Sequence, residues 1–95
     1  MNYKTIYVVN YKETTKFNDV GVNVSCGTCE LGYNTLDEAI AKVGELTDDV
    51  INNNLDLFEK CNGYRDSNDN GDCQSVTINN SIYEYWVSNV DIEMK

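Results

Sequence analysis

The sequence predicts an α+β fold, in which a small antiparallel sheet packs against one long or broken amphipathic helix in the order ββ-α-ββ. Three patterns predict this fold: alternating apolar residues near the N-terminus, a helical period in the middle, and renewed alternation near the C-terminus. Ninety-five residues can form one hydrophobic core but not two. We therefore expect a single domain over residues 1–95.

Two strands are predicted before the helix. Residues 3–11 alternate strictly and are rich in aromatic and β-branched types, as is typical of a strand. Residues 12–19 are mostly polar and predict a turn, after which a second strand pairs antiparallel with the first. The residues expected on one face of the first strand are Tyr3, Thr5, Tyr7, Val9 and Tyr11, and those expected on the inward face of the second are Val20, Val22, Val24 and Cys26.

A helix is predicted from Leu36 to Cys61. At 100° per residue its apolar side chains form one stripe about 140° wide, which indicates a face that packs on the core. Thr35 and Glu38 have the spacing of a capping box, and Asn62-Gly63 is typical of a left-handed helix end. Gly44 and the Thr47-Asp48-Asp49 sequence predict that any break in the helix falls between residues 44 and 49.

The C-terminal third predicts a loop and two strands. Residues 62–72 are mostly Asn, Asp and Gly and indicate a loop. Its segment 66–71 matches the first half of a calcium loop, but Thr77 stands where the bidentate glutamate belongs, so a plain polar loop is favoured. Val76 and Ile78 begin a strand, residues 79–81 form a turn, and residues 82–92 form a long last strand.

The four cysteines allow three interpretations. Cys26-Gly27-Thr28-Cys29 has the C-x-x-C spacing and an internal glycine that would let two thiolates point at one ion from a tight turn, and Cys61 and Cys73 complete a possible four-thiolate site for structural zinc. Disulfides and free buried thiols are the alternatives. A straight helix would hold Cys61 too far from Cys29, so the zinc site requires the chain to reverse between Gly44 and Asp49.

The composition excludes several functions. The chain has no histidine, which removes the commonest general base and the histidine-activated nucleophiles, and we do not expect an enzyme. The net charge of −9 disfavours direct binding of nucleic acid or of anionic membranes. No apolar run long enough for a membrane span and no signal peptide is visible, so a cytoplasmic location is expected.

The negative charge is concentrated in the middle of the chain. Residues 30–72 hold 11 acidic and 3 basic residues, whereas residues 1–29 carry a net charge of +1. On the helical wheel, six carboxylates lie opposite the apolar stripe and could either keep the protein soluble or bind a basic partner. These candidate partner-binding residues are Glu38, Glu45, Asp48, Asp49, Asp56 and Glu59.

In size and composition the chain resembles the small phage-borne anti-CRISPR proteins, which block a CRISPR effector nuclease, often in competition with its DNA. The resemblance rests on about 95 residues, strong acidity, 14 asparagines and 7 tyrosines, with no diagnostic motif. It implies an inhibitor of a CRISPR effector nuclease in the host cytoplasm. Together with the acidic helical face and the cysteines, it gives the leading hypothesis of an inhibitor that docks its carboxylate-rich helical face on a basic surface of a nucleic-acid-handling nuclease, scaffolded by the four-cysteine zinc site. The alternative is a small metal-stabilised structural or regulatory domain that does not compete with nucleic acid.

Overall fold

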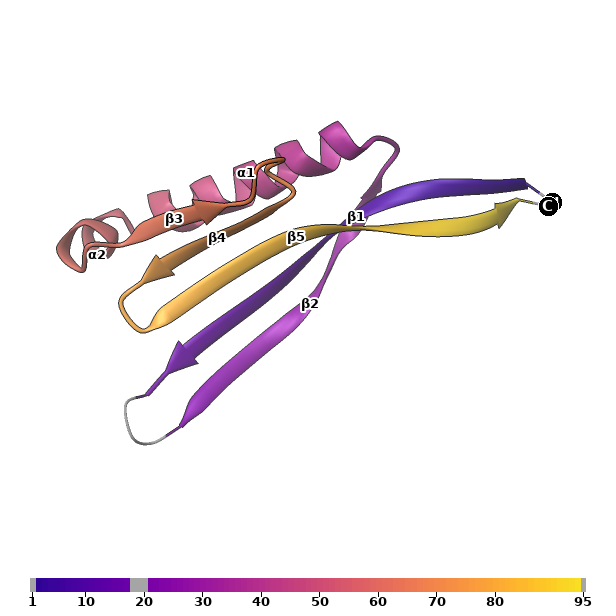
Figure 1. Ribbon diagram of the computed structural model, residues 1–95. Helices are drawn as coiled ribbons and strands as arrows, with labels where there is room; N and C mark the ends of the chain where they lie inside the picture. Colours follow the sequence, from indigo (N-terminus) through magenta and orange to yellow (C-terminus); the bar gives the residue numbers. More distant parts are fainter. Residues whose placement is uncertain (1, 18–20, 95) are drawn as a thin grey trace.

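The computed structural model describes residues 2–17 and 21–94 and consists of one antiparallel sheet with a long helix on one of its faces and a short second helix that leads from the long helix into the third strand (Figure 1). The elements are β1 (Asn2–Lys16), β2 (Val22–Tyr33), α1 (Leu36–Asn53), α2 (Leu55–Lys60), β3 (Tyr64–Ser67), β4 (Cys73–Ile78) and β5 (Ser81–Met94). The strands lie in the order β2-β1-β5-β4-β3, with every neighbouring pair antiparallel.

The predicted fold class was wrong in two respects. The chain is mostly antiparallel sheet with long strands, and its order is β-β-α-α-β-β-β instead of ββ-α-ββ. The additional strand, β3, lies in the segment predicted as a loop. All four of its residues are exposed, and it is held by pairing with β4. A strand without a buried face has no apolar alternation, so the pattern could not reveal it.

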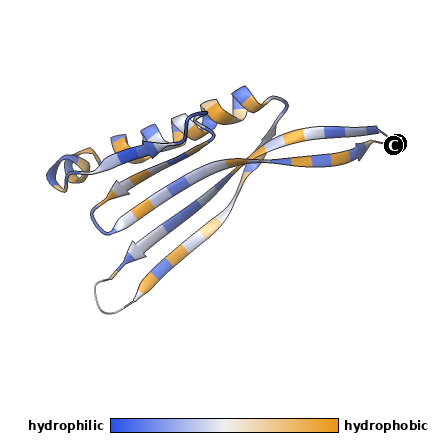
Figure 2. Cartoon of the chain, in the orientation of Figure 1, coloured by the Kyte–Doolittle hydropathy of each residue, from blue (hydrophilic) through white to orange (hydrophobic). Residues whose placement is uncertain are grey.

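The core lies between α1 and the inner face of the sheet, which is the face that the helix covers. Val9, Ala39, Val43 and Tyr85 form its buried cluster, and Tyr7 and Tyr11 pack against it with other half-buried residues. Tyr7, Val9 and Tyr11, which were predicted to share one face of the first strand, therefore lie together on the inner face. Figure 2 shows the alternation of apolar and polar residues along the strands.

The predicted inward face of β2 was wrong. Tyr11 pairs with Gly27 and packs on the core, so Gly27 and Cys29 face α1, whereas Val24 and Cys26 lie on the outer face. Gly27 sits under the Tyr11 ring, and a Cβ on Gly27 would lie 2.8 Å from the tyrosine oxygen. An aromatic side chain thus covers a strand glycine, and the valines of β2 are left in solvent. Val20 lies outside the described residues.

The helix begins as predicted and ends elsewhere. Thr35 caps α1, because its hydroxyl oxygen accepts the Glu38 N–H at 3.2 Å. α1 then runs unbroken through Gly44, and the break falls at Asn54 instead of between residues 44 and 49. Thr47 is fully buried and donates to the Val43 and Gly44 carbonyls, so it acts as a helix-interior residue and not as an N-cap.

The end of α2 has the predicted left-handed geometry. Asn62 has a φ of 51°, and the Gly63 N–H donates to the Phe58 carbonyl at 2.7 Å, as in a Schellman motif. In the part of the chain that the structure describes, no helix is long and apolar enough to cross a membrane.

β1 and β5 extend past the rest of the sheet as a two-stranded ribbon, with Asn2 paired to Met94 at its tip (Figure 1). β2 pairs with β1 only as far as Tyr7, and β4 pairs with β5 only as far as Trp86. The molecule measures 53 × 26 × 21 Å with a radius of gyration of 15.5 Å. A compact domain of this length has a radius of about 12 to 13 Å, so the ribbon makes the molecule distinctly elongated.

Candidate protein-binding surface

The acidic surface of α1 lies on the exposed part of the helix. Ala39 and Val43 are completely buried against the sheet, which fixes the orientation of the helix. Glu38, Glu45 and Asp49 are exposed and, at 100° per residue, lie within about 40° of one another and about 80° to 160° around the helix from Ala39 and Val43. Since the helix rises 1.5 Å per residue, this row extends for about 16 Å. α1 therefore presents a line of carboxylates to solvent.

The two remaining parts of the predicted surface differ from this row. Asp48 is exposed about 80° around α1 from Glu38, and Asp56 and Glu59 are exposed on α2, which follows the break at Asn54. The six predicted carboxylates are therefore all exposed, but they lie on two helices instead of one. Residues 36–60 contain 7 acidic residues and 2 lysines, so the local net charge is −5.

Two of the six carboxylates form ion pairs within the protein. Lys42 Nζ lies 3.5 Å from Glu45 Oε1, and Arg65 Nη1 lies 2.6 Å from Asp48 Oδ1. The Lys42 pair connects neighbouring exposed turns and contributes little to stability. Arg65 comes from β3 and neutralises much of the Asp48 charge. Glu38, Asp49, Asp56 and Glu59 carry the larger share of the available negative charge.

Arg65 also holds β3 to α1, a role that the sequence did not suggest. Its Nη2 donates to the Gly44 carbonyl at 3.1 Å and to Gln74 Oε1 at 3.0 Å, and it also contacts the Thr47 hydroxyl. Arg65 lies on the inner face, because it pairs with the buried Val76 of β4. The only signal in the sequence was that this is the single arginine of the chain.

The structure does not bring the four cysteines together. Cys26 and Cys29 lie on opposite faces of β2, Cys61 follows α2, and Cys73 begins β4. β1 and β5 separate β2 from β4, which places three strand spacings, about 14 Å, between them. All four are free thiols in this structure, with Cys26 and Cys73 exposed.

The reversal of the chain that a four-cysteine site requires does not occur, because α1 is continuous from residue 44 to residue 49. Gly27 lies in an extended strand and not in a tight turn. Among the described residues, no three His, Cys, Asp or Glu side chains are grouped to hold a metal ion. In this fold the four cysteines lie too far apart to bind one zinc ion together. Zinc binding stays a prediction for native mass spectrometry, where a chelator would remove about 65 Da.

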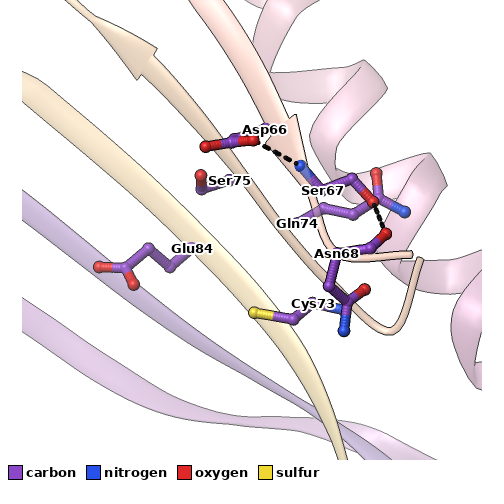
Figure 3. A pocket seen from close by; sticks show the side chains of 7 residues that line it. All are labelled: Asp66, Ser67, Asn68, Cys73, Gln74, Ser75 and Glu84. Carbon is purple, nitrogen blue, oxygen red and sulfur yellow. Dashed lines mark hydrogen bonds between the residues drawn. The ribbon is translucent and has the colours of Figure 1, made fainter. Parts of the chain in front are cut away.

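A shallow groove of about 240 Å³ lies on the outer face of β3, β4 and β5, away from α1 (Figure 3). Asp66, Ser75 and Glu84 form a cross-strand row in it, and Cys73 lines it nearby. Partial burial, followed by the charges of Asp72 and Glu84, raises the pKa of the Cys73 thiol. A thiol held in its protonated form is a poor nucleophile, so this groove has no activated reactive group.

The comparisons with known proteins add no assignment. No protein family, no curated protein and no solved structure matches the chain. Its function must therefore be argued from its own surface.

Proposed function

We propose that this chain is a small acidic binding protein that docks the carboxylates of α1 and α2 on a basic surface of a nucleic-acid-handling protein, and so interferes with that protein's engagement of DNA. The observation that carries the proposal is the row formed by Glu38, Glu45 and Asp49, which is exposed on one side of α1 while Ala39 and Val43 are buried against the sheet. Asp56 and Glu59 extend the negative surface onto α2.

The physical basis is a local charge of −5 over two short helices. Such a field attracts cationic surfaces and accelerates association with them, while it repels phosphate. A groove that binds nucleic acid is lined with Lys and Arg, because neutralising phosphates supplies most of its affinity. A rigid line of carboxylates about 16 Å long offers such a groove a substitute for several phosphates. The compositional resemblance to anti-CRISPR proteins makes a guide-loaded CRISPR effector nuclease the first partner to test.

The experiment measures how the protein affects target-DNA binding by a guide-loaded CRISPR effector nuclease, using a gel shift with labelled duplex. We expect the wild-type chain to displace DNA and to lose potency steeply as salt rises from low to physiological concentration. The double variant Glu38→Gln/Asp49→Asn should weaken this inhibition, because it removes two charges from the α1 row.

The matched control is Asp91→Asn/Glu93→Gln, which removes the same charge from the exposed end of β5. It should inhibit like the wild type. Equal loss in both double variants would show that only net charge matters, and equal potency in both would show that α1 is not the docking surface. Absence of inhibition across a panel of such nucleases would reject this class of partner.

A further inference from the structure

The two edges of the sheet differ in how they are protected against pairing with another strand. The β3 edge is four residues long and carries Arg65 and Asp66. β2, at the other edge, is twelve residues long, and its segment Val22–Thr28 pairs with β1 in regular register. This segment contains no charged residue, and the chain contains no proline. Short length, charge, proline and bulges are the usual devices that block an edge. Segment Val22–Thr28 has none of them, and the register shift of this pair lies beyond it, between Val8 and Asn10 of β1.

Exposed apolar side chains favour association at this edge. On the outer face, Val22 is 59% exposed and Val24 is 50% exposed. On the inner face, Leu31 is 66% exposed beside a groove of about 370 Å³ between β2 and α1. β-branched residues on an unpaired edge favour the addition of another strand.

The charges at the two ends of the edge indicate which strand would be added. Lys16 pairs with Val22 at one end, and the exposed Glu30 lies beyond Thr28 at the other. If β2 of a second copy pairs antiparallel around Cys26, Glu30 of each copy lies opposite Val22 of the other. Glu30 then approaches Lys16, which pairs with Val22. Parallel pairing would instead place like charges together. The absence of charge between the two ends also spares this edge the repulsion that a net charge of −9 causes elsewhere.

From these observations we propose that β2 is a self-association edge, which pairs antiparallel with β2 of a second copy around a two-fold axis. The two sheets then form one continuous sheet of ten strands, and the same surface serves both copies. The arrangement also brings the hairpin end of one copy, with its exposed Phe17, toward Leu31 of the other. This inference is independent of the acidic surface and of its proposed partner.

The first test measures the mass of the full chain in solution by sedimentation under reducing conditions, which exclude dimers linked by disulfides. We expect a dimer that dissociates on dilution. Val24→Asp should weaken self-association by about tenfold or more. The two-fold axis places the substitution in both copies, and each new carboxylate competes with Glu30 of the other copy for the nearby Lys16.

The matched control is Val90→Asp, since Val90 is 47% exposed on the same outer face but lies on the ribbon formed by β1 and β5. It should leave the dimer intact. A monomer at every concentration, or a dimer that Val90→Asp breaks and Val24→Asp does not, would overturn the proposal. Circular dichroism of both variants checks that they are folded.

A second test uses the charges at the ends of the edge. Glu30→Lys and Lys16→Glu should each weaken the dimer by about three- to tenfold, because each change places like charges together twice. The double variant should recover wild-type association. Within one copy, Glu30 lies about 25 Å along β2 from Val22, the residue that pairs with Lys16. Recovery can therefore only come from contact between copies. Failure of the double variant to recover would refute the antiparallel arrangement.

Discussion

Arg65 provides the sharpest test of how the sheet holds α1 in place. Replacing it with Met keeps most of the side-chain volume but removes the guanidinium that bonds Asp48, Gly44, Thr47 and Gln74. The side chains of Arg65 and Asp48 are 34% and 59% exposed, so the ion pair contributes at most about 1 kcal/mol. The bonds to the Gly44 carbonyl and to Gln74 join the exposed Arg65 to half-buried residues, and they contribute about 1 kcal/mol each.

Arg65→Met should therefore lower the free energy of unfolding by about 1 to 3 kcal/mol, measured by urea denaturation followed by circular dichroism. Asp48→Asn removes only the ion pair and should cost less than about 1 kcal/mol. If the two variants lose the same stability, the bonds from Arg65 to Gly44, Thr47 and Gln74 are energetically unimportant, and only the ion pair with Asp48 stabilises the fold. Arg65→Met should also strengthen docking on a basic partner, since it frees the Asp48 carboxylate, whereas Asp48→Asn should weaken it.

Two further predictions follow from the titrating groups. Burial, followed by the Glu13 charge, raises the pKa of Tyr85 to about 12. The neutral phenol therefore stabilises the fold fully below pH about 10, and this contribution is lost as pH rises through about 12. The urea midpoint of the wild type should fall over this range, and Tyr85→Phe should reduce that fall. An unchanged fall in the variant would contradict this prediction. Iodoacetamide should modify Cys73 slowly at neutral pH, because burial and the charges of Asp72 and Glu84 disfavour the thiolate. Glu84→Gln should accelerate the reaction, and peptide mass spectrometry that shows equal rates would refute the stated cause.

The parts of the fold that were predicted correctly are those in which one face is buried and the other is not. Val9 of β1 and Val43 of α1 are both completely buried, and their neighbours alternate with the period of a strand and of a helix, respectively. The Thr35 cap was also predictable, because capping depends on residues only three positions apart.

The errors arose where local pattern does not determine burial. β2 alternates in a way that fits either orientation, and the packing of Tyr11 over Gly27 selects the face that leaves Val24 in solvent. Any break in the helix was expected between Gly44 and Asp49, but burial of Thr47 against the sheet keeps this segment within α1. β3 exists because Arg65 and its neighbours pair with β4, a long-range contact that a local pattern cannot indicate.

The same limit applies to the candidate surface. The exposure of all six carboxylates follows from helical periodicity, and the sequence predicted it. Arg65 neutralises much of the Asp48 charge, and this ion pair depends on where β3 lies. No spacing along the chain could indicate it.

The two proposals have a joint geometric consequence. A two-fold axis that relates antiparallel edge strands in one continuous sheet is perpendicular to that sheet, so both inner faces point to the same side. Both copies of α1 would then present Glu38 and Asp49 in the same direction. A partner with an extended basic surface would meet both at once, and its apparent affinity would rise through avidity. Val24→Asp, which leaves α1 unchanged, should therefore weaken inhibition if both proposals hold, and it should leave inhibition unchanged if the acidic surface acts as a monomer.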